Sequence, residues 1–289
     1  MEQTIAALTS YQLKNFFYVP GCPAQEQCDK YATELTKRPS RPDFIHHVEK
    51  TYEGFVPWHT AAGRLGSLHV YTMRNVGGVS MYLARSSLHE NGCSLLRWTL
   101  TDFARFFASA WHNTPEALPL PDRESLCVDY TSDLTQLLNG LPTRFRPVLS
   151  GLISRPPDLV LTDWALVPNH IDLLENNIHV DPREGGRLTG VVGPFGMSIG
   201  EVENLLGVAR TGFSHEYHAN HRELRALFFE ELHRCVWLGS SVATAADKQH
   251  LGDASLIGLF LANGCRYEGG TRAPAREEDP ADDLPEGHT

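Results

Sequence analysis

Apolar and aromatic residues recur at helical spacing along residues 102–111, where one face collects Phe103, Phe106, Phe107, Ala110 and Trp111. A repeat at i, i+3, i+4 and i+7 is typical of an amphipathic helix that packs on a core. Thr101 precedes this stretch and is its expected N-cap. Similar patterns predict helices over 44–55, 121–155, 197–206, 224–238 and 254–262, and two helices within the first 36 residues.

Alternation of apolar and polar residues predicts fewer and shorter strands. Residues 56–73 read as a β-hairpin, whose second half alternates up to Met73. Residues 178–180 and 188–192 flank a turn with two adjacent glycines, Gly185 and Gly186, and predict a second hairpin. From Gly269 onward Pro, Glu, Asp and Ala predominate, which predicts a disordered acidic tail over 269–289. Many helices with few strands indicate an α+β fold.

Composition narrows the class of protein. The 289 residues can bury a substantial core, and a net charge of −10 gives no basis for binding nucleic acid. No apolar run reaches membrane-spanning length, and the first ten residues lack the features of a secretory signal. Six cysteines without a close CxxC pair are typical of reduced thiols. We therefore expect a cytoplasmic protein that binds neither nucleic acid nor membrane.

The most specific chemical motif lies at residues 170–180. His170, Asp172, Leu173 and Asn177 form the pattern HxDLxxxN, which leads into an alternating segment that ends at Val180. In phosphoryl transfer a carboxylate accepts the proton of the attacking hydroxyl, and an oxygen ligand placed a few residues later holds magnesium against the phosphates. Asp172 is the candidate base, Asn177 the candidate metal ligand and His170 the residue that braces the loop.

This block resembles the aminoglycoside phosphotransferase and choline kinase-like family, in particular its divergent fungal branch. The resemblance extends over most of residues 10–270 and includes a strand and hinge of the form VYxMxxxxG that ends at Gly78. It implies a protein-kinase-like fold of two lobes, with residues 1–75 as the N-terminal lobe and 76–268 as a mostly helical C-terminal lobe. It also implies ATP and Mg²⁺ as cofactors, with Met73 and Arg74 beside the adenine, and a small-molecule hydroxyl compound as substrate. The substrate's identity and the oligomeric state stay open.

Two segments of the family pattern are missing. Between Leu35 and Phe44 there is no glycine-rich turn followed by a strand that carries a lysine, and Val192 directly precedes Gly193 where an Asp-Trp segment with the second metal-binding carboxylate should intervene. Ile171 also replaces the glycine of the family loop. These departures predict a reduced N-terminal lobe and impaired transfer, so a non-catalytic kinase-like binding or scaffold protein is the alternative. An incomplete gene product would show the same gaps.

Other acidic and histidine residues in the sequence could contribute to a metal site. Glu201 and Glu203 are interpreted as part of a solvated helix face, with Glu201 the first candidate to replace the missing carboxylate. His215, His218 and His221 form an HxxHxxH pattern, but no cysteine or carboxylate completes a ligand set at suitable spacing. We therefore expect no zinc site there.

Overall fold

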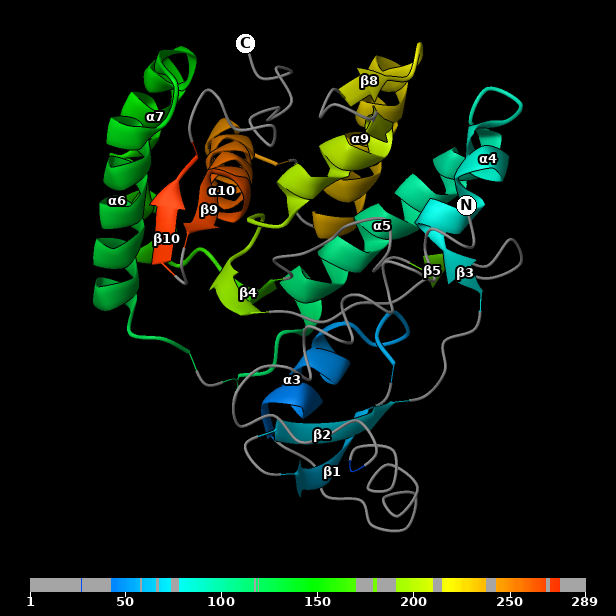
Figure 1. The fold of residues 1–289 in the computed structure, drawn as a ribbon, viewed down its shortest axis with the longest axis horizontal. Helices are drawn as coiled ribbons and strands as arrows, with labels where there is room; N and C mark the ends of the chain where they lie inside the picture. The colour runs from blue at the N-terminus through cyan, green and yellow to red at the C-terminus, as the bar shows by residue number, and fades with distance from the viewer. Residues whose placement is uncertain are drawn as a thin grey trace. The chain divides into compact units, whose positions relative to one another are not determined.

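The computed structural model describes residues 27, 43–57, 59–65, 68–73, 78–116, 118, 120–169, 179–180, 191–209, 215–237, 243–268 and 271–275. The described part is α+β, with long helices and short paired strands (Figure 1). The chain divides into two compact units, one formed by residues 1–49 and 57–75 and the other by residues 50–56 and 76–289. The two helices predicted within the first 36 residues lie outside the described residues.

The first unit contains the predicted hairpin. Strand β1 (His59–Leu65) pairs antiparallel with β2 (Leu68–Met73), from His59 opposite Met73 to Leu65 opposite Leu68, with an irregularity between Ala61 and Gly63. Helix α3 (Asp43–Thr51) begins in this unit and ends in the other. The helix predicted over 44–55 ends earlier, at Thr51, and the following turn contains Gly54 with a φ of +88°, a left-handed conformation that favours glycine.

The core of the second unit lies between α5 (Ser94–Asn113) and α9 (His221–Val236). Phe103 and Phe107 of α5 contact Phe228 of α9, with ring centroids 6.4 and 6.1 Å apart. The prediction that Thr101 caps α5 is wrong, because the helix begins seven residues earlier at Ser94. Leu96 and Leu100 extend the buried face toward the N-terminus, and both are fully buried.

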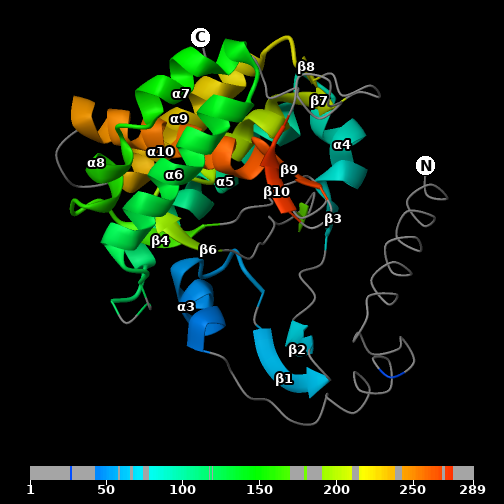
Figure 2. The same cartoon turned by 60° about the vertical axis from the view of Figure 1, so that its left-hand side comes forward.

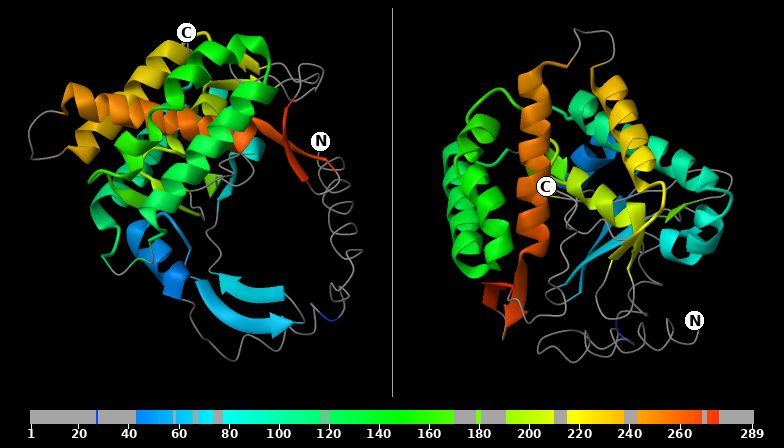
Figure 3. Two further views of the ribbon diagram at one scale, coloured as in Figure 1. Left: turned by 90° about the vertical axis from the view of Figure 1, so that its left-hand side faces the viewer. Right: turned by 90° about the horizontal axis from the view of Figure 1, so that it is seen from above.

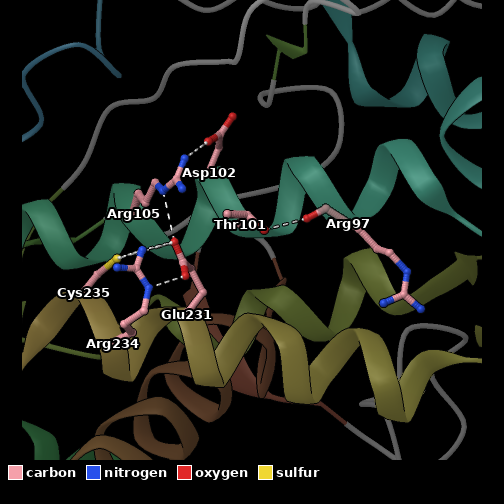
Figure 4. A network of polar contacts seen from close by, with 7 residues as sticks. All are labelled: Arg97, Thr101, Asp102, Arg105, Glu231, Arg234 and Cys235. Carbon is pink, nitrogen blue, oxygen red and sulfur yellow. Dashed lines mark hydrogen bonds and ion pairs between the residues drawn. The ribbon is translucent and has the colours of Figure 1, made fainter.

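Charged residues also join the same two helices (Figure 4). The carboxylate of Glu231 accepts hydrogen bonds from Arg234 at 2.7 and 2.8 Å and from Nε of Arg105 at 3.1 Å. Arg105 also donates to Asp102 one turn earlier, at 3.1 Å. Arg97 of α5 pairs separately with Glu223 at the start of α9, at 2.9 Å. Opposite charges therefore connect α5 and α9 near both ends of α9.

Most of the remaining helices of this unit follow the predicted order with changed boundaries, but helix α4 (Met81–His89) was not predicted. Residues 121–155 form α6 (Arg123–Gly140), a 3-10 turn η1 (Thr143–Phe145) and α7 (Arg146–Leu152). We expected the helices to end at Arg155, but Pro156 begins a short helix α8 (Pro156–Val160), since proline is tolerated in a first turn. Helix α10 (Ala245–Asn263) lies between α6 and α9 (Figures 1 and 3). It begins at a Thr244–Asp247 capping box.

In the part of the second unit that the structure describes, short strands form four pairs (Figure 2). They are β3 (Val79–Ser80) with β5 (His179–Val180), β4 (Leu166–Asn169) with β6 (Val191–Pro194), β7 (Gly207–Ala209) with β8 (His215–Tyr217), and β9 (Cys265–Glu268) with β10 (Thr271–Pro274). All four pairs are antiparallel.

These pairings correct two predictions. Where the predicted hairpin over 178–180 and 188–192 is described, its residues pair elsewhere, because β5 pairs with β3 and β6 pairs with β4, while residues 181–190 lie outside the described part. The tail is not disordered from Gly269, because residues 271–274 form strand β10. Residues 276–289 lie outside the described part. Local composition could not show either pairing, since the strand partners of β5 and β6 are distant in the sequence.

Within the described residues, no helix combines the length and the apolar character needed to cross a membrane. Cys93, Cys127, Cys235 and Cys265 are free thiols, and the first three are buried. Cys22 and Cys28, the closest pair in the sequence, lie outside the described residues.

Candidate functional site

The residues predicted to carry the chemistry lie mostly outside the described part of the chain. His170, Asp172 and Asn177 belong to the segment 170–178, and Arg74 also falls outside. Met73 is the last residue of β2, where its backbone is opposite His59, and its side chain is not described. We call segment 170–178 the candidate loop. The structure describes the strands that directly precede and follow it.

The N-terminal end of the candidate loop follows β4 directly. All four residues of β4 are buried, and the strand pairs with β6 from Leu166 opposite Pro194 to Asn169 opposite Val191. The hydroxyl of Tyr52 donates a hydrogen bond to the carbonyl of Pro168, and its ring stacks on Phe106 of α5 at 4.4 Å between centroids. Burial raises the pKa of Tyr52, so its proton stays in place to donate. Helix α5 therefore fixes β4 through Tyr52.

Asn169, the residue immediately before the candidate loop, is the polar centre of this end. Its side chain is 8% exposed, and its amide nitrogen donates to the carbonyls of Val167 at 3.1 Å and Pro194 at 3.2 Å. The hydroxyl of Ser198 donates to its amide oxygen at 3.3 Å. A buried amide with several partners is costly to displace, because each broken bond leaves a buried polar group unpaired. Asn169 thus locks β4, β6 and the following turn together.

Aromatic residues next to β4 and β6 also pack around the N-terminal end of the candidate loop. Trp164 donates from Nε1 to the carbonyl of Phe195 at 2.9 Å, and the backbone nitrogen of Phe195 donates to Ala165 at 2.8 Å. Trp111 of α5 contacts the rings of Trp164 and Phe195, each at 5.0 Å between centroids. The segment that leads into the candidate loop is therefore part of the hydrophobic core.

The C-terminal end of the candidate loop is held by a second strand pair. β5 follows the loop directly, and its His179 and Val180 are opposite Ser80 and Val79 of β3. Ser80 also caps helix α4 (Met81–His89), because its hydroxyl accepts from the backbone nitrogen of Leu83 at 3.4 Å. The loop thus leaves a strand tied to β6 and enters a strand tied to β3 and α4.

The Val192–Gly193 junction, where the resemblance would place a metal-binding carboxylate, lies inside β6. Val192 is opposite Pro168 and Gly193 opposite Val167, so the strand continues through the junction without interruption. A β-carbon at Gly193 would lie 3.0 Å from both the sulfur of Met197 and the hydroxyl of Tyr130. Burial raises the pKa of Tyr130. The junction is enclosed by neighbouring side chains.

Glu201 and Glu203 are not on a solvated helix face, and that prediction is wrong. Both lie in the 3-10 segment η2 (Ile199–Leu206), with only 5% and 4% of their surface exposed. Glu203 forms an ion pair with Arg225 of α9, at 2.6 Å between Oε1 and Nε. Glu201 accepts from Asn204 at 2.7 Å and from Asn263 of α10 at 3.2 Å. Both carboxylates are therefore engaged with η2, α9 and α10.

The three histidines of the HxxHxxH pattern occupy different elements. His215 lies in β8, His218 in the following turn and His221 at the first position of α9. Nδ1 of His221 lies 2.9 Å from the carbonyl oxygen of His218. Across the described ranges, no group of three or more His, Cys, Asp or Glu residues is arranged to hold a metal ion.

Sequence reasoning missed the residues that anchor the loop. The HxDLxxxN pattern gives no role to Asn169, which directly precedes it. The helix predicted over 44–55 includes Tyr52, whereas the observed helix α3 ends at Thr51. The one available signal was the position of Asn169, a polar residue at the end of an apolar segment and directly before His170. Its hydrogen-bond partners, Pro194 and Ser198, could not be foreseen without the pairing of β4 and β6.

Comparison with known proteins finds no protein-family model that matches this chain and no curated protein that matches it.

Proposed function

We propose that this chain is an aminoglycoside phosphotransferase-like protein with a two-lobed protein-kinase-like fold, whose transfer of phosphate from ATP to a small-molecule hydroxyl is impaired. Asp172 would accept the hydroxyl proton, His170 would brace the loop, and Asn177 would bind magnesium. Met73 and Arg74 would lie beside the adenine. This assignment rests on the HxDLxxxN motif and on the resemblance described above.

The observation that carries the proposal is the anchoring of the candidate loop at both ends. β4 holds its beginning through β6, Asn169 and Tyr52, and β5 holds its end through β3. A base and a metal ligand must keep their positions to within a fraction of an ångström, and residues on a loop do so only when rigid elements flank it. An incidental HxDxxxxN in a surface loop would not need such support.

The proposed impairment of phosphate transfer rests on the lack of the second magnesium-binding carboxylate that the resemblance implies. Magnesium in phosphate-transfer sites is commonly held by one or two carboxylates together with phosphate oxygens. The missing aspartate would belong at Val192–Gly193, which is a continuous part of β6. Glu203 is neutralised by Arg225, and Glu201 bonds to Asn204 and Asn263. Among the described residues, these two glutamates are thus engaged by other side chains and β6 carries no aspartate, so they do not fit a complete magnesium site and we assign no reaction step to the metal.

The same carboxylates favour a second candidate function, a non-catalytic kinase-like protein that retains the helical unit for binding or scaffolding. Because catalysis of phosphoryl transfer consists mainly of positioning and electrostatic stabilisation, loss of the charged groups removes most of what a protein contributes. The anchored loop would then persist as part of the fold.

The test is a transfer assay with γ-labelled ATP, Mg²⁺ and a panel of hydroxylated small molecules, on the wild type and on Asp172→Asn. We expect turnover far below the ~1–100 s⁻¹ typical of kinases, and any remaining turnover should be lost in Asp172→Asn. Turnover within the typical range would refute the impairment. Turnover that survives Asp172→Asn would refute the role of Asp172. No turnover in either protein would select the non-catalytic candidate.

A further inference from the structure

A contact between two histidines joins helix α4 to the turn that precedes α9. The rings of His89, the last residue of α4, and His218 lie 4.2 Å apart between centroids at 64°, an edge-to-face arrangement. Beside them, the side-chain nitrogen of Asn220 donates to the carbonyl of Gly92 at 3.2 Å. The end of α4 is thus docked on the β8–α9 turn, and Figure 2 shows β7 and β8 next to α4.

The backbone holds His218 in place. Its backbone nitrogen donates to Leu206 of η2 at 3.0 Å, and its carbonyl accepts from the backbone nitrogen of His221 at 2.9 Å. These two bonds fix the backbone of His218 on η2 and on the first turn of α9. Any repulsion between the two rings is more easily relieved by movement of α4.

The electrostatic surroundings allow a neutral pair and oppose a charged one. The positive charge of Arg85, one turn before His89 on α4, disfavours protonation of His89, as the charge of a protonated His218 also does. At the start of α5, Arg97 is paired with Glu223 of α9, and beyond Tyr217 the carboxylate of Glu203 is paired with Arg225. Other ionisable residues close in sequence to the pair are Glu90 and Cys93 in the α4–α5 connection, Glu216 and Tyr217 in β8, and His221 and Arg222 in α9.

Helix α4 connects this contact to the candidate loop. It begins at Ser80, which is both its N-cap and the last residue of β3. β3 pairs with β5 at the end of the candidate loop, and α4 itself contacts β5 (Figure 1). A displacement of α4 therefore acts on the strand pair that fixes the loop.

We propose that the His89–His218 contact is an acid-sensitive latch, closed while the imidazole of His89 is neutral and opened when it takes up a proton. Its opening releases α4 and loosens β3 and β5, so that acid weakens the hold on the candidate loop. This consequence for the site rests on the proposed function, whereas the latch itself does not.

The direction of the pH dependence follows from linkage. Burial first, and then the charges of His218 and Arg85, lower the pKa of His89 to about 4 from its ordinary 6.5. An open state with an ordinary pKa binds more protons between these values, so the closed state is fully favoured above about pH 6.5 and loses stability as the pH falls toward 4. At pH 5 the full shift corresponds to an opening constant raised about 30-fold, and the half-buried position of His89 reduces this to about tenfold.

The experiment is hydrogen–deuterium exchange at pH 7 and pH 5, corrected for the intrinsic exchange rate, on the wild type and on His89→Phe. Phenylalanine keeps an aromatic ring beside His218 but cannot be protonated. His233→Phe is the matched control, because burial and Lys248 also lower the pKa of His233, which lies on α9 near its far end. His89→Gln provides a second uncharged variant in case the phenylalanine variant does not fold.

In the wild type and in His233→Phe, we expect the protection of amides in β3, α4 and β5 to fall about tenfold between pH 7 and pH 5. In His89→Phe or His89→Gln this loss should disappear. Equal protection at the two pH values in the wild type, or the same loss in the His89 variants, would overturn the latch. A loss confined to α4 would overturn its connection to the candidate loop. Exchange involves no nucleotide, so failure of the proposed function leaves this result unaffected.

Discussion

Replacement of Glu231 by glutamine tests whether the charged residues between α5 and α9 stabilise the helical unit. The side chain of Glu231 is 13% exposed and accepts hydrogen bonds from Arg234 and Arg105 (Figure 4). Hydrogen bonding to Arg234 is the largest cause that lowers the pKa of Glu231 to about 2 from its ordinary 4.5, and the positive charges of both arginines add to it. Glutamine keeps the shape of the side chain but loses the charge and one of the acceptor oxygens.

The magnitude follows from the shift in pKa. A difference of about 2.5 pH units corresponds to ~3.4 kcal/mol if the group were fully shielded from solvent. The side chains of Arg105 and Arg234 are 46% and 55% exposed, so solvent screening reduces this considerably. We expect Glu231→Gln to lower the free energy of unfolding at pH 7 by about 1–2 kcal/mol.

The sign of the pH dependence gives a second readout. Because the pKa of Glu231 is depressed in the folded state, its contribution is complete above about pH 4.5 and is lost as the pH falls toward 2. Urea unfolding at pH 7 and pH 3, followed by circular dichroism, should therefore show a smaller loss of stability on acidification in Glu231→Gln than in the wild type. Asp102→Asn is the control, since its pair with Arg105 joins two half-exposed side chains and should contribute no more than ~0.5 kcal/mol. Equal effects of the two substitutions at pH 7, or an unchanged acid dependence, would refute the reasoning.

Two further predictions concern packing around η2. Gly258→Ala in α10 should destabilise the fold by about 1–3 kcal/mol, because a β-carbon would collide with the backbone carbonyl of Met197, whereas Gly252→Ala in the same helix meets no atom within 4 Å and should stabilise it by about 0.5–1 kcal/mol. Urea unfolding of both variants checks this, and a shared direction of change would contradict it. Arg225→Met should cost about 2 kcal/mol by leaving the buried carboxylate of Glu203 without its cation, and Glu203→Gln added to it should recover part of that loss. No recovery in the double variant would show that the pair is not the cause.

Periodicity predicted the helices of the second unit better than their ends. The aromatic face of residues 102–111 identified α5, and Leu96 and Leu100 extend the same buried face by two turns beyond the predicted start of the helix. The helix instead begins after Cys93, whose backbone has a φ of +60°. A non-glycine residue in the left-handed region is uncommon, and local sequence gives little warning of it.

In the candidate site, too, the features set by neighbouring residues could be predicted, whereas those set by contacts between distant segments could not. The HxDLxxxN motif is contiguous, so the sequence could indicate it, whereas its anchors depend on strand pairs between distant segments. Glu203 illustrates the point, because its spacing next to Glu201 suggested a solvated face. Its burial depends on Arg225, 22 residues later in α9. Whether a charged residue is exposed depends on the cation that the fold brings to it, and no local pattern contains that information.

The central claim, a kinase-type loop that lacks its principal metal carboxylate, is tested most directly by the thermal stability of the protein with millimolar ATP and Mg²⁺. A ligand at ~100 times its dissociation constant stabilises the folded state by ~2.7 kcal/mol, which a thermal shift detects readily. The account predicts no shift for the wild type and the same result for Asp172→Asn. A clear shift that requires both ATP and Mg²⁺, and that is lost in Asn177→Ala, would contradict it, because a complete metal site would then exist around Asn177.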